Sequence, residues 1–186
     1  MFSTFKIDRL STEKSPNLIE LPSLKKGDQG MSDVEQKSII EELKKLYCME
    51  LEVVMNYLAN SIILDGVRAE EIKKALAADV TEELLHARQL GERIKQLGGR
   101  VPGSLELTFG QKTLQPPSST TDVTAVIEGV LNAENQAIEQ YYAVIRVCEG
   151  IDYVTQDLAI KLVADEETHR TLFEGYLKEY QNSSSN

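Results

Sequence analysis

Two four-residue stretches decide the fold of this chain, Glu83-Leu84-Leu85-His86 and Glu166-Glu167-Thr168-His169. In both, a histidine follows a glutamate by three positions, and these two are the only histidines in the 186 residues. Side chains three residues apart lie on one face of an α-helix, so each pair can bind the same ion. A single Glu-x-x-His is common on solvated helices, so its interpretation depends on the sequence around it.

Each stretch is preceded by another glutamate at nearly the same distance. Glu50 lies 33 residues before Glu83, and Glu134 lies 32 residues before Glu166. The two halves of the chain therefore repeat one pattern, which is the ligand pattern of helical bundles that bind two metal ions. We predict six metal ligands, which are also the candidate catalytic residues: Glu50, Glu83, His86, Glu134, Glu166 and His169.

The surrounding sequence predicts four helices. Residues 33–97 contain no proline, carry apolar residues at helical spacing and are divided by a turn at Asp65-Gly66. Residues 121–180 show the same pattern with a break at Gly150. The segment 98–120 holds three prolines and is too long for a hairpin turn. The predicted fold class is all-α: a ferritin-like four-helix bundle of two antiparallel helix hairpins joined by a long crossover.

The domain organisation follows from these patterns. We predict a flexible N-terminal tail at residues 1–32, the bundle at 33–180 and a disordered C-terminus at 181–186. The tail lacks sustained periodicity and carries five basic against four acidic residues, so its charge is +1 and the rest of the chain carries −11. We interpret the tail as disordered. The alternative is that its apolar residues between Leu18 and Leu24 dock onto a partner protein.

Composition excludes several functional classes. The net charge of −10 argues against nucleic acid as the main partner, because phosphate binding needs a basic face. No apolar run approaches the length of a membrane span, and the first residues do not form a secretory signal. Cys48 and Cys148 lie too far apart in the sequence for a disulfide framework or a cysteine zinc site. We expect a cytoplasmic protein.

The charges of the six predicted ligands indicate the metal. Four buried glutamates cannot all stay ionised without compensation, because a buried unpaired charge is very costly. Two divalent cations would balance them, and carboxylate with imidazole donors suits iron or manganese better than zinc. We predict two iron ions, with manganese as the alternative. One half-site is assigned mainly to Glu50, Glu83 and His86, and the other to Glu134, Glu166 and His169.

Four neighbouring residues have alternative roles. Tyr57 and Tyr141 each follow a predicted ligand by seven residues. They either hydrogen-bond to ligand carboxylates or carry an electron, or they are ordinary core residues. We interpret Asp79 and Glu82 as part of a solvated helix face, and the alternative is that they orient His86.

The six ligands, together with residues 50–57, Gly98-Gly99-Arg100-Val101-Pro102, 152–158 and 165–169, resemble bacterioferritin and its ferritin-like relatives. The resemblance covers about residues 35–180. It implies that the protein oxidises Fe²⁺ to Fe³⁺ with O₂ or peroxide at a di-iron centre, and that ferric iron is stored in a hollow cage. It also implies that Glu83 and Glu166 bridge the two metals.

The chain departs from this family in three places. Bacterioferritin binds haem through a methionine directly after the first motif glutamate; Leu84 stands there, so the resemblance implies no haem. The family has a short fifth helix, whereas 17 residues follow His169. We therefore expect a homo-oligomer, with a dimer slightly favoured over a cage. The N-terminal tail is an addition.

Two other functions remain as alternatives. A rubrerythrin-like peroxidase, or another di-iron oxidase, would use the same six ligands. Rubrerythrins carry an electron-transfer domain with the pattern CxxC…CxxC, which this sequence does not contain. They also have a further glutamate one turn after the third-helix ligand, and this chain has Ala137 at that position. A metal-free helical interaction protein would be expected to have lost ligands, and none is lost.

Overall fold

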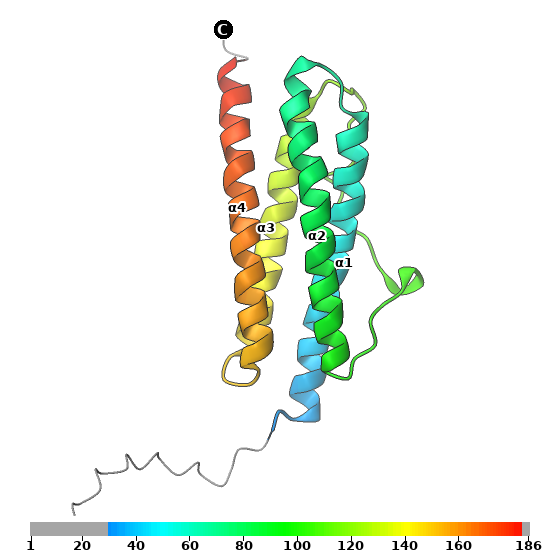
Figure 1. The fold of residues 1–186 in the computed structure, drawn as a ribbon, viewed down its shortest axis with the longest axis vertical. Helices are drawn as coiled ribbons and strands as arrows, with labels where there is room; N and C mark the ends of the chain where they lie inside the picture. Colours follow the sequence, from blue (N-terminus) through cyan, green and yellow to red (C-terminus); the bar gives the residue numbers. More distant parts are fainter. Residues whose placement is uncertain (1–29, 184–186) are drawn as a thin grey trace, which may run out of the picture. The chain divides into compact units, whose positions relative to one another are not determined.

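The computed structural model describes residues 30–183, which form an all-helical bundle without a β-strand in that range (Figure 1). This confirms the predicted fold class. A long crossover containing the short 3-10 turn η2 (Ser104–Glu106) separates the second helix from the third, and η1 (Val67–Ala69) lies in the first hairpin turn. The four α-helices are α1 (Asp33–Ile63), α2 (Glu70–Gln96), α3 (Val123–Cys148) and α4 (Tyr153–Ser183).

Capping residues explain where the helices begin and end. Ser32 caps α1: its hydroxyl accepts from the Glu35 amide at 3.3 Å, and the Glu35 carboxylate accepts from the Ser32 amide at 2.8 Å. Asp122 caps α3 by accepting from the Ala125 amide. Beyond α2, Gly98 has φ +74°, a conformation that favours glycine. The predicted tail, apart from residues 30–32, lies outside the described residues.

The C-terminal prediction is wrong in part, because α4 continues through Ser183. Tyr180 is buried, its hydroxyl donates to the carbonyl oxygen of Arg68, and the Arg68 guanidinium lies 4.4 Å from the centre of its ring. This contact holds the last turns of α4 against the α1–α2 turn, so residues 181–183 continue the helix. Residues 184–186 lie outside the described part.

The apolar core is divided into two clusters along the bundle. One includes Leu46, Leu90 and Ala137, and the other includes Val53, Leu76 and Ala133. On α1, α2 and α3 the predicted ligands lie in sequence between these two sets, and on α4 they lie between Val163 and Phe173. The bundle therefore contains a polar layer between two apolar layers.

Polar side chains of α1 order the long crossover. The Glu52 carboxylate accepts from the Gln111 amide at 2.7 Å, and the Asn56 side chain donates to the Gln111 side chain at 2.9 Å. One turn further, Asn60 donates to the carbonyl oxygen of Leu114 at 3.0 Å. These α1 residues are four apart and lie on one face. The crossover is thus bound along α1.

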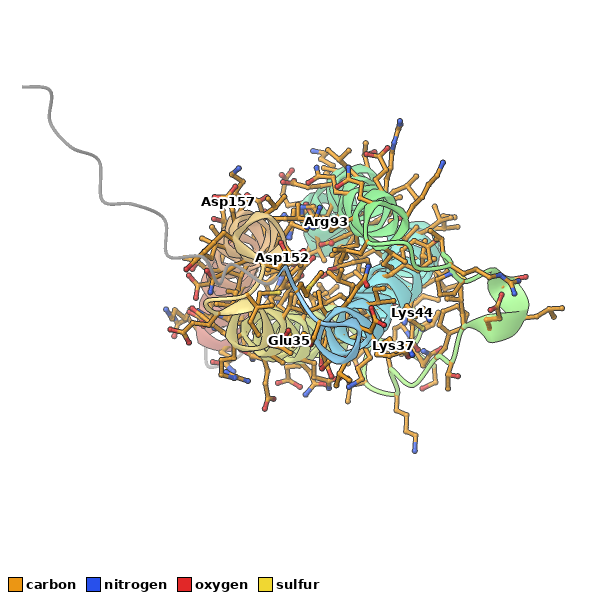
Figure 2. All side chains as sticks on the ribbon, turned by 90° about the horizontal axis from the view of Figure 1, so that it is seen from below. Glu35, Lys37, Lys44, Arg93, Asp152 and Asp157 are labelled. Carbon is orange, nitrogen blue, oxygen red and sulfur yellow. The ribbon has the colours of Figure 1, made fainter. Side chains whose placement is uncertain are left out.

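An ion pair joins the end of α2 to the start of α4. The Arg93 guanidinium donates to both Asp152 carboxylate oxygens, at 2.9 and 2.8 Å (Figure 2). It also donates to the Thr155 hydroxyl at 2.7 Å. Asp152 also caps α4 by accepting from the Thr155 amide. Although burial alone would raise the pKa of Asp152, hydrogen bonds from Thr155 and Arg93 hold it below its ordinary value.

No helix within residues 30–183 has the length and apolar character of a membrane span.

We expect Asp152→Ala to lower the free energy of unfolding by about 3 kcal/mol, because it leaves the largely buried Arg93 unpaired. Since the pKa of Asp152 lies below 3.8, this contribution is complete at neutral pH and is lost only in stronger acid. Urea unfolding measures the change. Asp157→Ala, which removes an exposed pair with Lys161, is the matched control and should have little effect. Equal losses in the two variants would contradict this role.

Candidate metal centre

The structure brings all six predicted ligands into the polar layer. Glu50 projects from α1 and Glu134 from α3, while α2 and α4 each supply one glutamate and one histidine. All six side chains are buried, and the most exposed of them, His169, is 6% accessible. The spacing of three within each Glu-x-x-His pair places both side chains on the same inward face.

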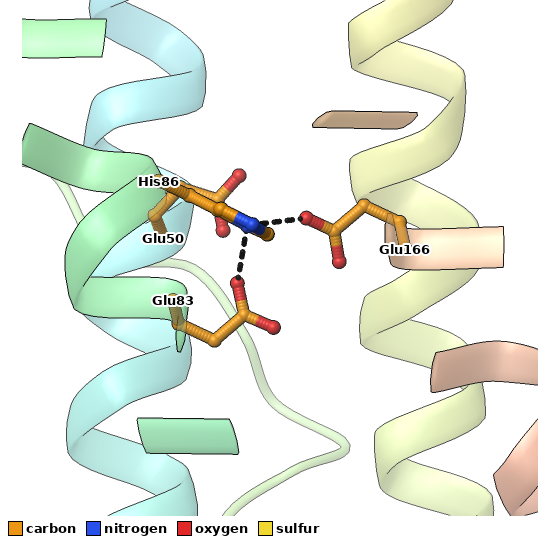
Figure 3. A group of neighbouring side chains, drawn as sticks. All are labelled: Glu50, Glu83, His86 and Glu166. Atoms are coloured by element: carbon orange, nitrogen blue, oxygen red, sulfur yellow. Dashed lines mark hydrogen bonds and ion pairs between the residues drawn. The ribbon is translucent and has the colours of Figure 1, made fainter. Parts of the chain in front are cut away.

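The six residues form two overlapping groups. Glu50 and His86 lie with Glu83 and Glu166 in one group (Figure 3), and Glu134 and His169 lie with the same two glutamates in the other. Within each group the donor atoms lie within 4.8 Å of one another. Glu83 and Glu166 belong to both, which is the arrangement that two bridging carboxylates require.

The two imidazole rings present the same nitrogen to this layer. Nδ1 of His86 lies 3.0 Å from Glu166 and 3.2 Å from Glu83 (Figure 3). Nδ1 of His169 lies 3.2 Å from Glu83 and 3.6 Å from Glu166. The rings are stacked, with centroids 6.5 Å apart. Both Nδ1 atoms thus lie beside the shared carboxylates.

The Nε2 atoms contact carboxylates outside the layer. Nε2 of His86 lies 3.5 Å from Asp165, and Nε2 of His169 lies 3.4 Å from Glu82. Each partner directly precedes a shared glutamate and contacts the histidine of the opposite helix. Asp165 was not among the residues that we selected from the sequence. The signal was present, since an acidic residue precedes the glutamate in both motifs.

The expectation of a solvated helix face is wrong for Asp79 and correct for Glu82. Asp79 is buried, at 7% accessibility, so it is not part of a solvated face, although the Glu82 side chain is half exposed. Glu82 forms its closest ion-pair contact with His169 rather than with His86. The reason is that α2 faces α4 here, so a residue of α2 meets the ring on the neighbouring helix.

Hydrogen bonding to ligand carboxylates is confirmed for both tyrosines. The fully buried Tyr57 of α1 donates to Glu134 of α3, and Tyr141 of α3 donates to Glu50 of α1, the latter at 2.5 Å. The two contacts are reciprocal across the α1–α3 interface. They orient the two carboxylates that are not shared between the groups.

The electrostatics of the layer call for positive charge. Burial, followed by the charges of Glu166 and Glu83, raises the pKa of both Glu50 and Glu134 well above the ordinary value. Burial opposes protonation of His86, yet its contacts with Glu166 and Glu83 raise its pKa to about 10. Protons therefore compensate the carboxylates when no cation is bound, and a cation would displace them.

Buried atoms that lack a hydrogen bond show that the layer fits metal ions. Neither carboxylate oxygen of Glu83 accepts a hydrogen bond and Nδ1 of His169 makes none, although all three atoms are buried and only the ion-pair contacts with the histidines reach Glu83. Buried polar atoms are almost always partnered, because an unpaired one is costly. Carboxylate oxygens with imidazole nitrogens are donors that suit Fe²⁺ and Mn²⁺. The donor set therefore fits two divalent cations.

Comparison with protein families and curated sequences gives consistent matches. A family model described as a ferritin-like domain matches residues 40–183. Bacterioferritin of Desulfovibrio desulfuricans is 28% identical over 148 residues, covering 78% of this chain and 77% of that protein. The DNA protection during starvation protein of Pyrococcus furiosus is 25% identical over 148 residues, covering 77% of this chain and 79% of that protein.

Solved structures show the same fold. The X-ray structure of D. desulfuricans bacterioferritin, described with a diiron site in different catalytic states, has a TM-score of 0.70 at 26% identity, over 80% of this chain and 83% of that one. A dodecameric thioferritin, the bacterioferritin-related protein of Bacteroides fragilis, has a TM-score of 0.69 at 22% identity, over 81% and 90%. Our preference for a dimer finds no support among these relatives.

We expect excess Mn²⁺ to raise the melting temperature of the protein by about 5–10 °C at a concentration 100 times its Kd. Glu83→Gln should lose this gain, while its metal-free form should melt no lower than the metal-free wild type, because the change removes a charge from a crowd of carboxylates. Thermal melts of chelator-treated protein with and without Mn²⁺ measure both. Glu139→Gln, on the exposed face of α3, should behave as wild type. If Mn²⁺ left the melting temperature of the wild type unchanged, that result would contradict a preformed metal site.

Proposed function

The chain belongs to the ferritin-like domain family, and from this premise we propose that it oxidises Fe²⁺ to Fe³⁺ with O₂ or peroxide at the six-ligand layer. The observation that carries the proposal is the pair of overlapping donor groups that share Glu83 and Glu166. Two shared carboxylates favour two ions side by side. Two Fe²⁺ ions bound there would each supply one electron to the oxidant.

Each ligand has an assigned role in this proposal. Glu50 and His86 would hold one ion, Glu134 and His169 would hold the other, and the two shared glutamates would contact both. The hydroxyls of Tyr57 and Tyr141 orient the unshared carboxylates through their hydrogen bonds.

The residues around the layer orient the histidines and keep water out. The ion-pair contacts of Asp165 with Nε2 of His86, at 3.5 Å, and of Glu82 with Nε2 of His169, at 3.4 Å, would hold each ring with Nδ1 facing the bound ions. The apolar clusters at both ends of the layer restrict solvent access along the bundle axis. Exposed Glu82 and half-buried Asp165 leave the α2–α4 side as the polar approach for a cation.

We also propose that the chain self-associates. Met55, Leu58 and Ile62 of α1 are spaced by three and four residues and are 46%, 49% and 71% exposed. They form an apolar stripe on the outside of the bundle, and such stripes typically mark contact surfaces. A second copy of the chain is the proposed occupant. A closed shell of copies would be needed for storage of ferric iron, in addition to its oxidation.

We expect Glu134→Ala to slow the oxidation of Fe²⁺ by about 10- to 100-fold or more, because losing a ligand should cost at least as much as losing a residue that supports one. The assay mixes Fe²⁺ with the metal-free protein in air and follows ferric absorbance. Glu139→Ala, exposed on the same helix, is the matched control and should keep the wild-type rate. An unchanged rate in Glu134→Ala would contradict the proposal. Faster turnover with peroxide and an electron donor would favour the rubrerythrin-like alternative.

We expect light scattering to give a mass of at least two chains of 20.8 kDa each. Leu58→Asp should lower the measured mass, because the new carboxylate would lie in a subunit contact. Val67→Asp changes a residue that is 93% exposed outside the stripe and serves as the control. A monomeric wild-type protein would refute self-association. Bound iron far above two ions per chain would indicate storage.

A further inference from the structure

A short stretch of the long crossover, Thr113-Leu114, contacts both α1 and α3, the two helices that carry the unshared ligands. Leu114 is fully buried, and the Asn60 side chain of α1 donates to its carbonyl oxygen at 3.0 Å. The hydroxyl of Thr113 donates to the Asn132 side chain of α3 at 2.8 Å. The stretch is therefore attached to both helices at once.

A glycine of α3 makes room for this stretch. A Cβ atom at Gly129 would lie 2.5 Å from the carbonyl oxygen of Thr113 and 3.1 Å from Cα of Leu114. Both distances are well inside van der Waals contact, so a larger residue at Gly129 would push the crossover away from α3. Gly175 of α4 differs, because a Cβ atom there would meet no atom within 4 Å. Gly129 thus sets how closely the crossover approaches α3.

Leu114 belongs to the same apolar cluster as Tyr57. Both side chains are fully buried in it, together with apolar residues of α1 and α3. Asn60, which binds the backbone of Leu114, follows Tyr57 by three residues on the same side of α1. The Tyr57 hydroxyl crosses from α1 to the Glu134 carboxylate of α3. The position of this hydroxyl therefore depends on packing that Leu114 completes.

The other tyrosine has no fully buried crossover residue in its cluster. Tyr141, which donates to Glu50 at 2.5 Å, lies in the second apolar cluster. No buried member of that cluster comes from residues 98–122, and from this range only the partly buried Val101 packs against it. The stretch Thr113-Leu114 thus acts on one of the two tyrosine–glutamate contacts, and the other contact serves as an internal control.

We propose that the crossover positions one metal ligand: Leu114, seated against Gly129, keeps the Tyr57 hydroxyl on Glu134 and so fixes that carboxylate for one of the two ions. Leu114 and Gly129 are positioning residues, since neither belongs to the donor groups. The inference rests on the part of the proposed function in which the six-ligand layer binds two ions. It gives the two donor groups unequal dependence on the crossover, although their ligands match.

The experiment measures Mn²⁺ binding to the metal-free full chain by equilibrium dialysis. Gly129→Ala should weaken one of the two Mn²⁺ ions by about 10-fold and leave the other unchanged, because the new methyl group displaces the crossover. Gly175→Ala changes a helical glycine with open space around it, so this matched control should bind both ions as the wild type does. In Mn²⁺-soaked crystals of Gly129→Ala, the anomalous signal should fall beside Glu134 and persist beside Glu50.

Two further variants test the same contact without a steric clash. Leu114→Ala leaves a cavity in the cluster of Tyr57 and should weaken the same ion. Leu114→Met keeps the side-chain volume and should retain the wild-type affinity. In a Tyr57→Phe background, which lacks the hydroxyl, Leu114→Ala and Gly129→Ala should cause no further loss of Mn²⁺ affinity. This last comparison separates positioning through Tyr57 from a general loss of stability.

The inference is overturned if Gly129→Ala and Leu114→Ala leave both Mn²⁺ affinities unchanged or weaken both ions equally. It is also overturned if they weaken Mn²⁺ binding by the same factor in the Tyr57→Phe background as in the wild type. A wild-type protein that binds two Mn²⁺ ions and responds as expected, yet does not oxidise Fe²⁺, would count against the proposed function and leave the inference standing. The two failures are therefore distinguishable.

Discussion

Four glutamate side chains buried in one layer are the constraint on which this structure depends. An apolar layer at this position along the bundle would stabilise it by packing. The glutamates instead repel one another and lose their hydration on burial; they are Glu50, Glu83, Glu134 and Glu166. Protons on these groups and on the histidines relieve the repulsion only in part, since neither oxygen of Glu83 accepts a hydrogen bond. The layer therefore fits cations, and its buried charges lower the stability of the fold when no cation is bound.

The rest of the bundle compensates for that layer. Apolar clusters lie on both sides of it along the helices, and the Arg93–Asp152 pair joins α2 to α4 at one end. At the other end Tyr180 joins α4 to the α1–α2 turn. The hydroxyls of Tyr57 and Tyr141 then hold the unshared carboxylates in place. Rigid surroundings of this kind keep ligands preorganised when the ions are absent.

The internal repeat of the chain is not exact. The two halves match at the ligands and at the tyrosines, which gives a site with approximate two-fold character. They differ four residues before each shared glutamate, where one half has Asp79 and the other has Leu162. Only the Asp79 side carries an unpartnered buried carboxylate. One histidine of the pair thereby gains a second carboxylate neighbour on its outer face, and the two donor groups are not equivalent.

The helices and the convergence of the six predicted ligands were predictable from the sequence alone, because helical periodicity and a spacing of three are local properties of the chain. The crossover was visible as a proline-rich gap, but its attachment to Glu52 and Asn56 was not. Likewise, the burial of Asp79 and the contact of Glu82 with His169 needed the tertiary structure. These features pair residues from different segments of the chain. Such pairs depend on how each helix is rotated about its own axis, and that rotation results from the packing of the whole bundle.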